Sequence, residues 1–214
     1  MLKWSAALVS AAALMSFAAP AHAGVLDNVQ ITLGVSGVLP NESADISVIG
    51  GDVSISDEYV PTLAIEYFFN DNVSLQLLCC AARHDVRAIG TSVGSGTVDL
   101  GQITHFPPTL TLKYHWTDWG NFQPYVGAGV NYTHFFDEEL PAGGVATAID
   151  YSDSFGPALQ AGFDYRLNEH WALNVDVRHI WINSDVTIYA GPTRIDADAD
   201  INPWVITTGV AYRF

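Results

Sequence analysis

The sequence predicts an all-β protein, namely an eight-stranded antiparallel transmembrane β-barrel. Three observations predict it: apolar residues recur at every second position, the connections alternate between short and long, and charge is scarce. Charged residues make up 14% of the chain, against about 25% in soluble domains, while hydrophobic residues make up 49%. Apolar residues that alternate with polar ones suit a barrel wall that has lipid outside and a polar interior.

The N-terminal segment, residues 1–23, is predicted to be a cleaved signal peptide. It contains a basic residue, Lys3, an apolar stretch and the small-residue site Ala21-His22-Ala23, which together are typical of secretory signals. An uncleaved anchor is the alternative, but the apolar stretch is short for a membrane span. Residues 24–214 are therefore expected to form the barrel domain.

The first three predicted strands are Asn28–Val38, Tyr59–Phe69 and Val73–Ala82. Strict alternation divides the residues of each strand between two faces. It turns Glu66 inward in the second strand and Leu78 inward in the third. The outward residues are Val29, Ile31, Leu33, Val35, Leu63, Ile65, Tyr67, Phe69, Val73, Leu75, Leu77 and Cys79.

The next three predicted strands are Ile103–Trp116, Gln123–Phe135 and Ser154–Leu167. Alternation continues through all three, and many of the inward positions are threonine, glycine or alanine. Such small residues suit the narrow interior of an eight-stranded barrel. The outward residues are Leu110, Leu112, Tyr114, Trp116, Val126, Ala128, Val130, Tyr132, Leu159, Ala161, Phe163 and Tyr165.

The last two predicted strands are Trp171–Asn183 and Trp204–Phe214. The final strand alternates strictly and ends on an aromatic residue with no polar tail behind it. This ending resembles the recognition strand of bacterial outer-membrane barrels. The resemblance implies that Trp204–Phe214 closes the barrel against the first strand and is recognised by the barrel-assembly machinery.

The connections between these strands fall into two length classes. Segments 70–72, 117–122 and 168–170 are short, and 83–102 is one of the long ones, interpreted as a glycine-rich loop. Outer-membrane barrels have short periplasmic turns and long extracellular loops, so the short class is expected at the periplasmic end. The other long connections are 39–58, 137–153 and 184–203.

Aromatic residues are expected to form a girdle at each membrane interface. The set predicted for the short-turn end is Tyr67, Phe69, Trp116, Trp119, Tyr165, Trp171, Tyr212 and Phe214, and that for the other end is Tyr59, Phe106, Tyr132, Phe155, Trp181 and Trp204.

The formal net charge of −15 argues against a nucleic-acid partner. Most of the acidic residues fall in the long connections, where simple solvation is one interpretation. The alternative is that they bind divalent cations of the lipopolysaccharide layer. In either case, outer-membrane lipid and lipopolysaccharide are the expected surroundings.

Charged residues also fall on the inward register, although the chain has few basic residues. Charges in a confined interior need partners, so we predict an ion-pair network near the periplasmic end that closes the lumen to bulk flow. Individually hydrated charges are the alternative, because the interiors of these barrels are commonly wet. The predicted network consists of Glu66, Lys113, Asp164, Arg166, Asp176 and Arg213.

No catalytic, metal or cofactor site is predicted. Cys79 and Cys80 are adjacent, so on a strand they face opposite sides and a disulfide between them would be strained. They are interpreted as small hydrophobic residues, one facing lipid and one facing the lumen. A lipid-modifying enzyme is a third function class, but the histidines lack a nucleophile arrangement. These histidines are His84, His105, His115, His134, His170 and His179.

Four stretches, in the same order along the chain, resemble the OmpW family of outer-membrane proteins. They are Phe106-Pro107-Pro108-Thr109-Leu110, Pro124 to Thr133, Asp164-Tyr165-Arg166-Leu167-Asn168 and Asn202 to Phe214. The resemblance covers essentially the whole chain after the signal peptide. It implies an eight-stranded outer-membrane barrel with a narrow, largely apolar lumen, and passive uptake of small hydrophobic or amphipathic molecules, since related members carry alkanes.

The resemblance also suggests that substrate leaves sideways through the barrel wall into the membrane. Pro107 and Pro108 cannot donate hydrogen bonds to a neighbouring strand, so we predict a gap in the wall there, with Leu78, Phe106 and Thr109 at its threshold. The alternative is that the prolines have no role in transport and only end the strand. A purely structural or adhesive barrel with acidic extracellular loops is the alternative function.

One residue departs from the family pattern. Family members can place a lumenal aromatic residue in the seventh strand as part of an apolar constriction, whereas this chain has Arg178 there. The constriction is therefore expected to be more polar here, or to lie elsewhere.

Overall fold

The computed structural model describes residues 26–92, 96–144 and 146–214. The predicted signal peptide, residues 1–23, lies outside this described part. Among the described residues, none forms a helix long and apolar enough to cross a membrane. The strands are β1 (Val29–Leu39), β2 (Ser43–Ile46), β3 (Asp52–Ile55), β4 (Glu58–Phe68), β5 (Val73–Cys79), β6 (Ala82–Ile89), β7 (Thr97–Phe106), β8 (Thr109–His115), β9 (Phe122–Glu139), β10 (Ala148–Tyr151), β11 (Ser154–Arg166), β12 (Trp171–Ile180), β13 (Asn183–Ala190), β14 (Thr193–Asp200) and β15 (Trp204–Arg213).

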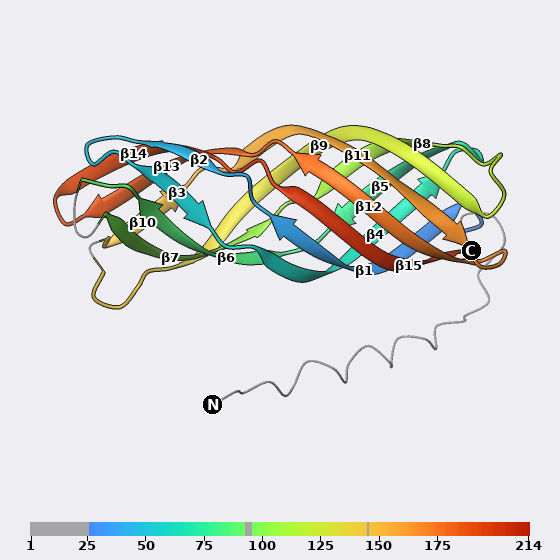
Figure 1. Ribbon diagram of the computed structural model, residues 1–214, viewed down its shortest axis with the longest axis horizontal. Coiled ribbons are helices and arrows are strands. Elements are labelled where there is room, and N and C mark those ends of the chain that lie inside the picture. The colour runs from blue at the N-terminus through green and yellow to red at the C-terminus, as the bar shows by residue number, and fades with distance from the viewer. Residues whose placement is uncertain (1–25, 93–95, 145) are drawn as a thin grey trace, which may run out of the picture.

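Eight strands close into an antiparallel barrel. Their order around the ring is β1, β4, β5, β8, β9, β11, β12 and β15, and β15 pairs with β1. Figure 1 shows these strands tilted along the long axis of the molecule. The last strand pairs with the first from Gln30 opposite Arg213 to Leu39 opposite Trp204. The predicted fold class and the closure of the barrel by the C-terminal strand are therefore confirmed.

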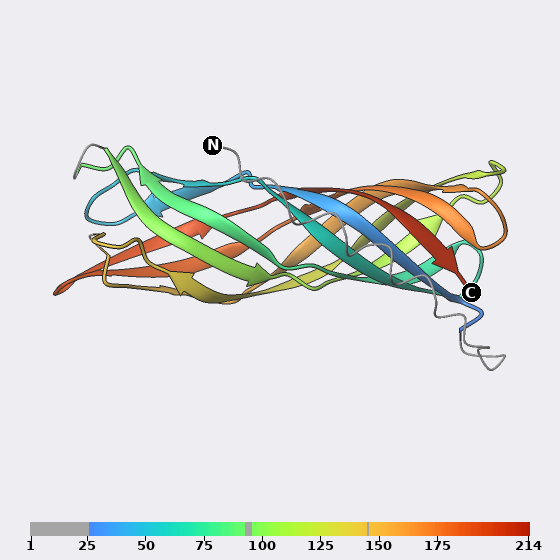
Figure 2. The same ribbon diagram turned by 90° about the horizontal axis from the view of Figure 1, so that it is seen from below.

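Strands extend into all of the long connections and cover most of 83–102 and 184–203, so the interpretation of 83–102 as a glycine-rich loop was wrong. β6 and β7 pair as a hairpin that continues β5 and β8, while β10, β13, β14 and β2 form a second sheet. Figures 1 and 2 show all of these elements extending the barrel at one end. We call this the long-hairpin end. The local reason is that alternation continues through the hairpin: Val86 and Ala88 are buried, whereas Arg87 and Ile89 are exposed.

The opposite end, which we call the short-turn end, has tight turns stabilised by asparagine side chains. Asn70 Oδ1 accepts hydrogen bonds from the backbone N–H groups of Asn72 and Val73, each over 2.9 Å. Asn168 Oδ1 does the same for His170 and Trp171, each again over 2.9 Å. Such side-chain turns allow a strand to reverse within a few residues.

The two faces of the wall divide as alternation predicted. Most apolar side chains on the outer face are exposed, including both predicted aromatic girdles except Tyr212, which is partly buried. The inner face changes character along the barrel axis. Toward the long-hairpin end it is a continuous apolar cluster that includes Val38, Val60, Cys80, Ile103, Phe135, Ile180, Ile182, Val186 and Val205. Toward the short-turn end the buried residues are mainly polar or charged.

Candidate functional site

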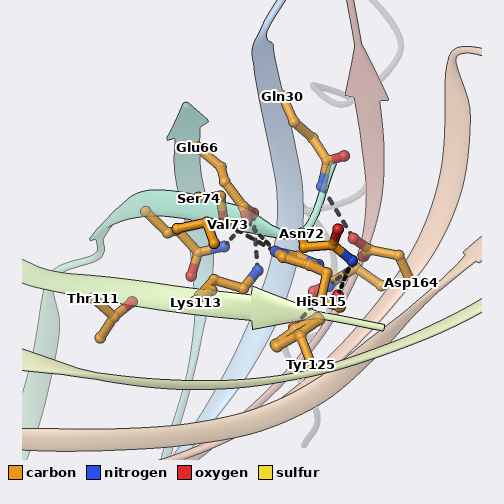
Figure 3. A network of polar contacts seen from close by, with 12 residues as sticks. Gln30, Glu66, Asn72, Val73, Ser74, Thr111, Lys113, His115, Tyr125 and Asp164 are labelled. Atoms are coloured by element: carbon orange, nitrogen blue, oxygen red, sulfur yellow. Dashed lines mark hydrogen bonds and ion pairs between the residues drawn. The ribbon is translucent and has the colours of Figure 1, made fainter. Parts of the chain in front are cut away.

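Glu66 on β4 is the centre of a buried polar cluster near the short-turn end, drawn in Figure 3. Its Oε1 accepts a hydrogen bond from Ser74 Oγ over 2.5 Å and lies 2.9 Å from His115 Nε2. Its Oε2 accepts hydrogen bonds from Lys113 Nζ over 2.9 Å and from Gln76 Nε2 over 3.0 Å. The side chains of Glu66 and Lys113 are 1% and 0% exposed. This buried carboxylate therefore has the partners that a charge in a confined interior requires.

The polar cluster extends across the lumen through Tyr125. Lys113 Nζ lies 3.6 Å from the centroid of the Tyr125 ring. The Tyr125 hydroxyl donates to Asp176 Oδ2 over 2.9 Å and accepts a hydrogen bond from Asn174 Nδ2 over 3.0 Å. Asn174 Nδ2 also donates to Asp164 Oδ1 over 2.7 Å. Side chains from β8, β9, β11 and β12 thus join into one network.

A second polar layer lies across the lumen at Arg178, and we call it the crossing layer. Arg178 Nη2 donates to Gln76 Oε1 over 2.8 Å. Gln160 Nε2 donates to the same oxygen over 3.3 Å, and its own Oε1 accepts from Thr111 Oγ1 over 2.8 Å. Asp176 Oδ1 lies 3.5 Å from Arg178 Nη2. All five side chains are buried, so the crossing layer and the Glu66 cluster place polar and charged side chains across the short-turn half of the lumen.

The apolar half of the lumen meets the crossing layer at Leu78. Leu78 is 4% exposed and lines a small cavity together with Ala64 and Arg178. The lumen therefore changes from apolar to polar over the short distance between Leu78 and the crossing layer.

The sheet ladder between the third and fourth strands of the ring is interrupted at the two prolines. β5 pairs with β8 up to Leu78 opposite Thr109, and the ladder resumes at Ala82 opposite His105. Between these pairs, residues 79–81 face residues 106–108 with no ladder pairing. Proline lacks the N–H that a ladder needs, which accounts for the break.

On its other side the proline segment is firmly held. Asn131 Nδ2 donates to the Pro107 carbonyl over 3.1 Å and to the Pro108 carbonyl over 3.3 Å. The backbone N–H of Tyr132 also donates to the Pro108 carbonyl, over 3.1 Å. Pro107 is buried, whereas Phe106 is 37% exposed on the outer face. Phe106 therefore lies outside the wall, and Leu78 and Pro107 lie inside it.

Comparison with known proteins identifies the family. The model of the OmpW family matches residues 27–214, nearly the whole described chain. The chain belongs to the OmpW family. An uncharacterized outer-membrane protein, y4mB of Sinorhizobium fredii, is 41% identical over 92% of this chain and 85% of its own length. Outer membrane protein AlkL of Ectopseudomonas oleovorans is 32% identical over 81% of this chain and 76% of its own.

The solved structure of another outer-membrane protein has the same architecture. The crystal structure of the outer membrane protein OprG from Pseudomonas aeruginosa matches with a TM-score of 0.78 at 32% identity, covering 87% of this chain and 95% of that one. This OmpW-family chain is therefore an outer-membrane barrel. In such barrels the short turns face the periplasm and the long loops face the outside, so the long-hairpin end is taken as extracellular.

Two basic residues of the predicted ion-pair network do not form ion pairs within the described chain. Arg213 packs its guanidinium 3.9 Å from the centroid of the Phe68 ring, and Arg166 Nη2 donates to the backbone carbonyl of Glu169 over 3.3 Å. Both are only partly buried. They lie at the periplasmic mouth, where water can solvate a guanidinium, so neither needs a carboxylate. Within the described chain, the ion-pair network therefore does not extend to Arg166 and Arg213, as had been predicted.

The residues that sequence reasoning passed over are neutral. Gln76, Tyr125 and Asn131 make the central hydrogen bonds of the crossing layer, the Glu66 cluster and the proline segment. Alternation puts Gln76, two residues before inward Leu78, and Asn131, between outward Val130 and Tyr132, on the inward register, and this is the signal that could have found them. Their roles were missed because only charged inward residues were counted as site candidates.

Proposed function

We propose that this OmpW-family barrel is a passive route into the outer membrane for small hydrophobic or amphipathic molecules. They enter from the extracellular end and leave sideways between the third and fourth strands. Enzymatic activity forms no part of the proposal. The observation that carries it is the change of polarity along the lumen at Leu78.

The change of polarity supports lateral exit in preference to passage into the periplasm. An apolar solute that moves from the apolar cluster toward the periplasm would meet the buried charges of the Glu66 cluster. Removing partners from a buried ion pair is costly, so that half of the lumen opposes apolar passage. The family resemblance, which implies uptake of small hydrophobic molecules, supports the same class of solute.

The interrupted ladder supports a specific exit. It lies beside Leu78, at the level where the apolar lining ends, with Cys80 and Pro107 buried on its inner side. Unpaired backbone groups are expensive in hydrocarbon and are tolerated near an interface or beside a cavity. Phe106 belongs to the aromatic girdle predicted for the end opposite the short turns, which supports a gap close to the extracellular interface. A solute that passes between residues 79–81 and 106–108 would reach lipid directly.

Trp204–Phe214 is proposed to be the segment that the barrel-assembly machinery recognises, and lipopolysaccharide is the proposed neighbour of the extracellular half. A structural or adhesive barrel without transport is the competing function. Uptake by reconstituted liposomes separates the two, since only the transport proposal requires a flux of apolar solute.

A reversible tether across the gap tests the exit route. In a background in which Cys79 and Cys80 are replaced by alanine, Ala81→Cys and Phe106→Cys would place two thiols on the exposed outer face at positions that continue the ladder register. We expect oxidation to abolish uptake of a labelled alkane and reduction to restore it, with the barrel folded in both states.

The matched control places the tether where the ladder is intact. Leu77 and Leu110 are partners in the same strand pair, on the periplasmic side of the gap. The barrel that carries Leu77→Cys and Leu110→Cys should pass the alkane equally fast in its oxidised and its reduced form. Normal uptake through the barrel tethered at 81 and 106 would show that the solute leaves elsewhere.

A further inference from the structure

The guanidinium of Arg178 is buried but not fully hydrogen-bonded. Its Nη2 donates to Gln76, whereas Nε and Nη1 have no partner among the described residues. The hydroxyl of Thr32 on β1 is also buried, again without a partner in the described part of the chain. Buried polar groups are nearly always satisfied, and each exception calls for an explanation. Arg178 and Thr32 line the same lumenal cavity, so one occupant could satisfy both.

The size of the cavity limits what can occupy it. Its volume is about 10 Å³, which is close to the minimum that a single water molecule needs. The cavity therefore has room for one oxygen atom beside Arg178 and Thr32.

The surrounding charges also favour a neutral occupant. Asp176 Oδ1 lies 3.5 Å from Arg178 Nη2 and compensates part of its positive charge. The extracellular extension that a solute must pass carries exposed aspartates, among them Asp45, Asp185 and Asp198, which face one another across β2, β14 and β13. These aspartates alternate with buried residues and so lie on the outer face of the extension, where acidic groups lower the local concentration of anions. A neutral hydrogen-bond acceptor avoids this repulsion.

The other side of the cavity is apolar. Ala64 and Leu78 line it, and the apolar cluster of the extracellular half continues beyond them. A molecule with its oxygen at Arg178 would therefore have its hydrocarbon part in the apolar half of the lumen.

We propose that Arg178 and Thr32 form a site that binds the single oxygen atom of a neutral amphipathic solute, such as an alkanone or an alkanol, while its alkyl chain lies against Leu78. The proposal rests on the proposed uptake function and names its preferred substrate class.

Nuclear magnetic resonance of the barrel in lipid nanodiscs tests the site directly. The probes are octan-2-one, nonane and octanoate, and the signal is the Nε–H resonance of Arg178, assigned by its loss in Arg178→Met. We expect octan-2-one to shift this resonance and to bind more tightly than nonane or octanoate. Arg178→Met should weaken octan-2-one binding roughly tenfold to hundredfold, as loss of a hydrogen bond to a charged group predicts, without weakening nonane binding.

Two threonine variants refine the test. Thr32→Val should weaken octan-2-one binding less than Arg178→Met does. Thr62 lines the same cavity, but its hydroxyl is already paired with Ser36 Oγ over 2.6 Å, so Thr62→Val should leave the preference for octan-2-one over nonane in place. If Arg178→Met does not fold, the order of the three affinities in the wild type and the effect of Thr32→Val on octan-2-one binding still test the site.

The outcomes separate this proposal from the proposed function. Equal binding of octan-2-one and nonane, tighter binding of octanoate, or an Arg178 resonance that no probe shifts would overturn the oxygen site. If nonane crosses liposomes under those results, the uptake function still stands. Conversely, a shift by octan-2-one without any flux would retain the site and refute uptake.

Discussion

Arg178 on β12 donates a hydrogen bond over 2.8 Å to Gln76 on β5, a residue 102 positions earlier in the chain. β12 and β5 lie opposite each other in the ring of eight strands, so this one hydrogen bond spans the lumen. Gln160 and Thr111 join the same layer from two further strands. The lumen is thus closed by side chains of the wall itself.

The first prediction concerns the crossing layer. Gln76→Ala removes the oxygen that Arg178 and Gln160 share and also one donor to Glu66. We expect single-channel conductance for small ions in planar bilayers to rise. Gln102→Ala, an exposed residue of the β6–β7 hairpin, is the control and should leave conductance unchanged. Equal conductance of Gln76→Ala and wild type would mean that the Glu66 cluster closes the lumen by itself.

The second prediction concerns the buried ion pair. Lys113→Met leaves Glu66 without its ammonium partner, and breaking a buried pair in this way costs about 3 kcal/mol or more. Urea unfolding in lipid vesicles should measure that loss. Glu66→Gln combined with Lys113→Met should recover much of it, because neither position then carries an unpaired buried charge.

The matched control for that pair is an exposed one. Arg194 Nε lies 2.8 Å from Asp196 Oδ1, and both side chains are at least 60% exposed. Arg194→Met should cost less than about 1 kcal/mol, as exposed pairs usually do. A comparable loss in both variants would contradict the interpretation that burial makes the difference.

The third prediction concerns pH and two stacked histidines on the extracellular side of Phe106. The rings of His84 and His105 are 5.0 Å apart and nearly parallel. Burial, with a smaller contribution from neighbouring His84, lowers the pKa of His105 to about 3. Because an unfolded histidine has a pKa of about 6.5, the unfolded chain binds more protons between these values, and stability must fall as the pH falls.

The expected effect is a loss of roughly 2 kcal/mol at pH 5 relative to pH 8, which follows from an unfolded pKa of about 6.5. Hydrogen exchange of the β6–β7 backbone amides would measure it. His105→Gln should flatten the pH dependence over this range. A hairpin that is equally protected at both pH values in the wild type would contradict the prediction.

The fourth prediction concerns Gly162 on β11. A Cβ at this position would lie 2.6 Å from the Tyr125 hydroxyl oxygen and would also meet the backbone oxygen of Val175. Gly162→Ala should therefore displace Tyr125 from Asp176 and cost about 1–3 kcal/mol, as overpacking typically does. Thermal unfolding measures the cost. At Gly37 a Cβ meets only the Tyr59 ring, at 3.2 Å or more, so Gly37→Ala should lower the melting temperature less.

The sequence by itself determined which residues of each strand face the lumen and which face outward. Alternation has a period of two residues and is a local property, so it correctly turned Glu66, Lys113 and Arg178 inward and Leu110 outward. The short asparagine turns were equally visible, because an Asn side chain acts on the backbone two or three residues away. The count of eight barrel strands followed from these local signals.

Only the tertiary structure decided which inward residues meet. Partners across the lumen depend on how far each strand is staggered against the next and on closure of the ring, and no local period records either quantity. For this reason the sequence did not show that Lys113 pairs with Glu66 or that Arg178 donates to Gln76. Nor did it show that Arg213 lies at the periplasmic mouth beside Phe68, where water can solvate its charge. The same closure placed the interrupted ladder at Pro107 and Pro108 beside Leu78, because the stagger of β5 against β8 sets what lies opposite the prolines.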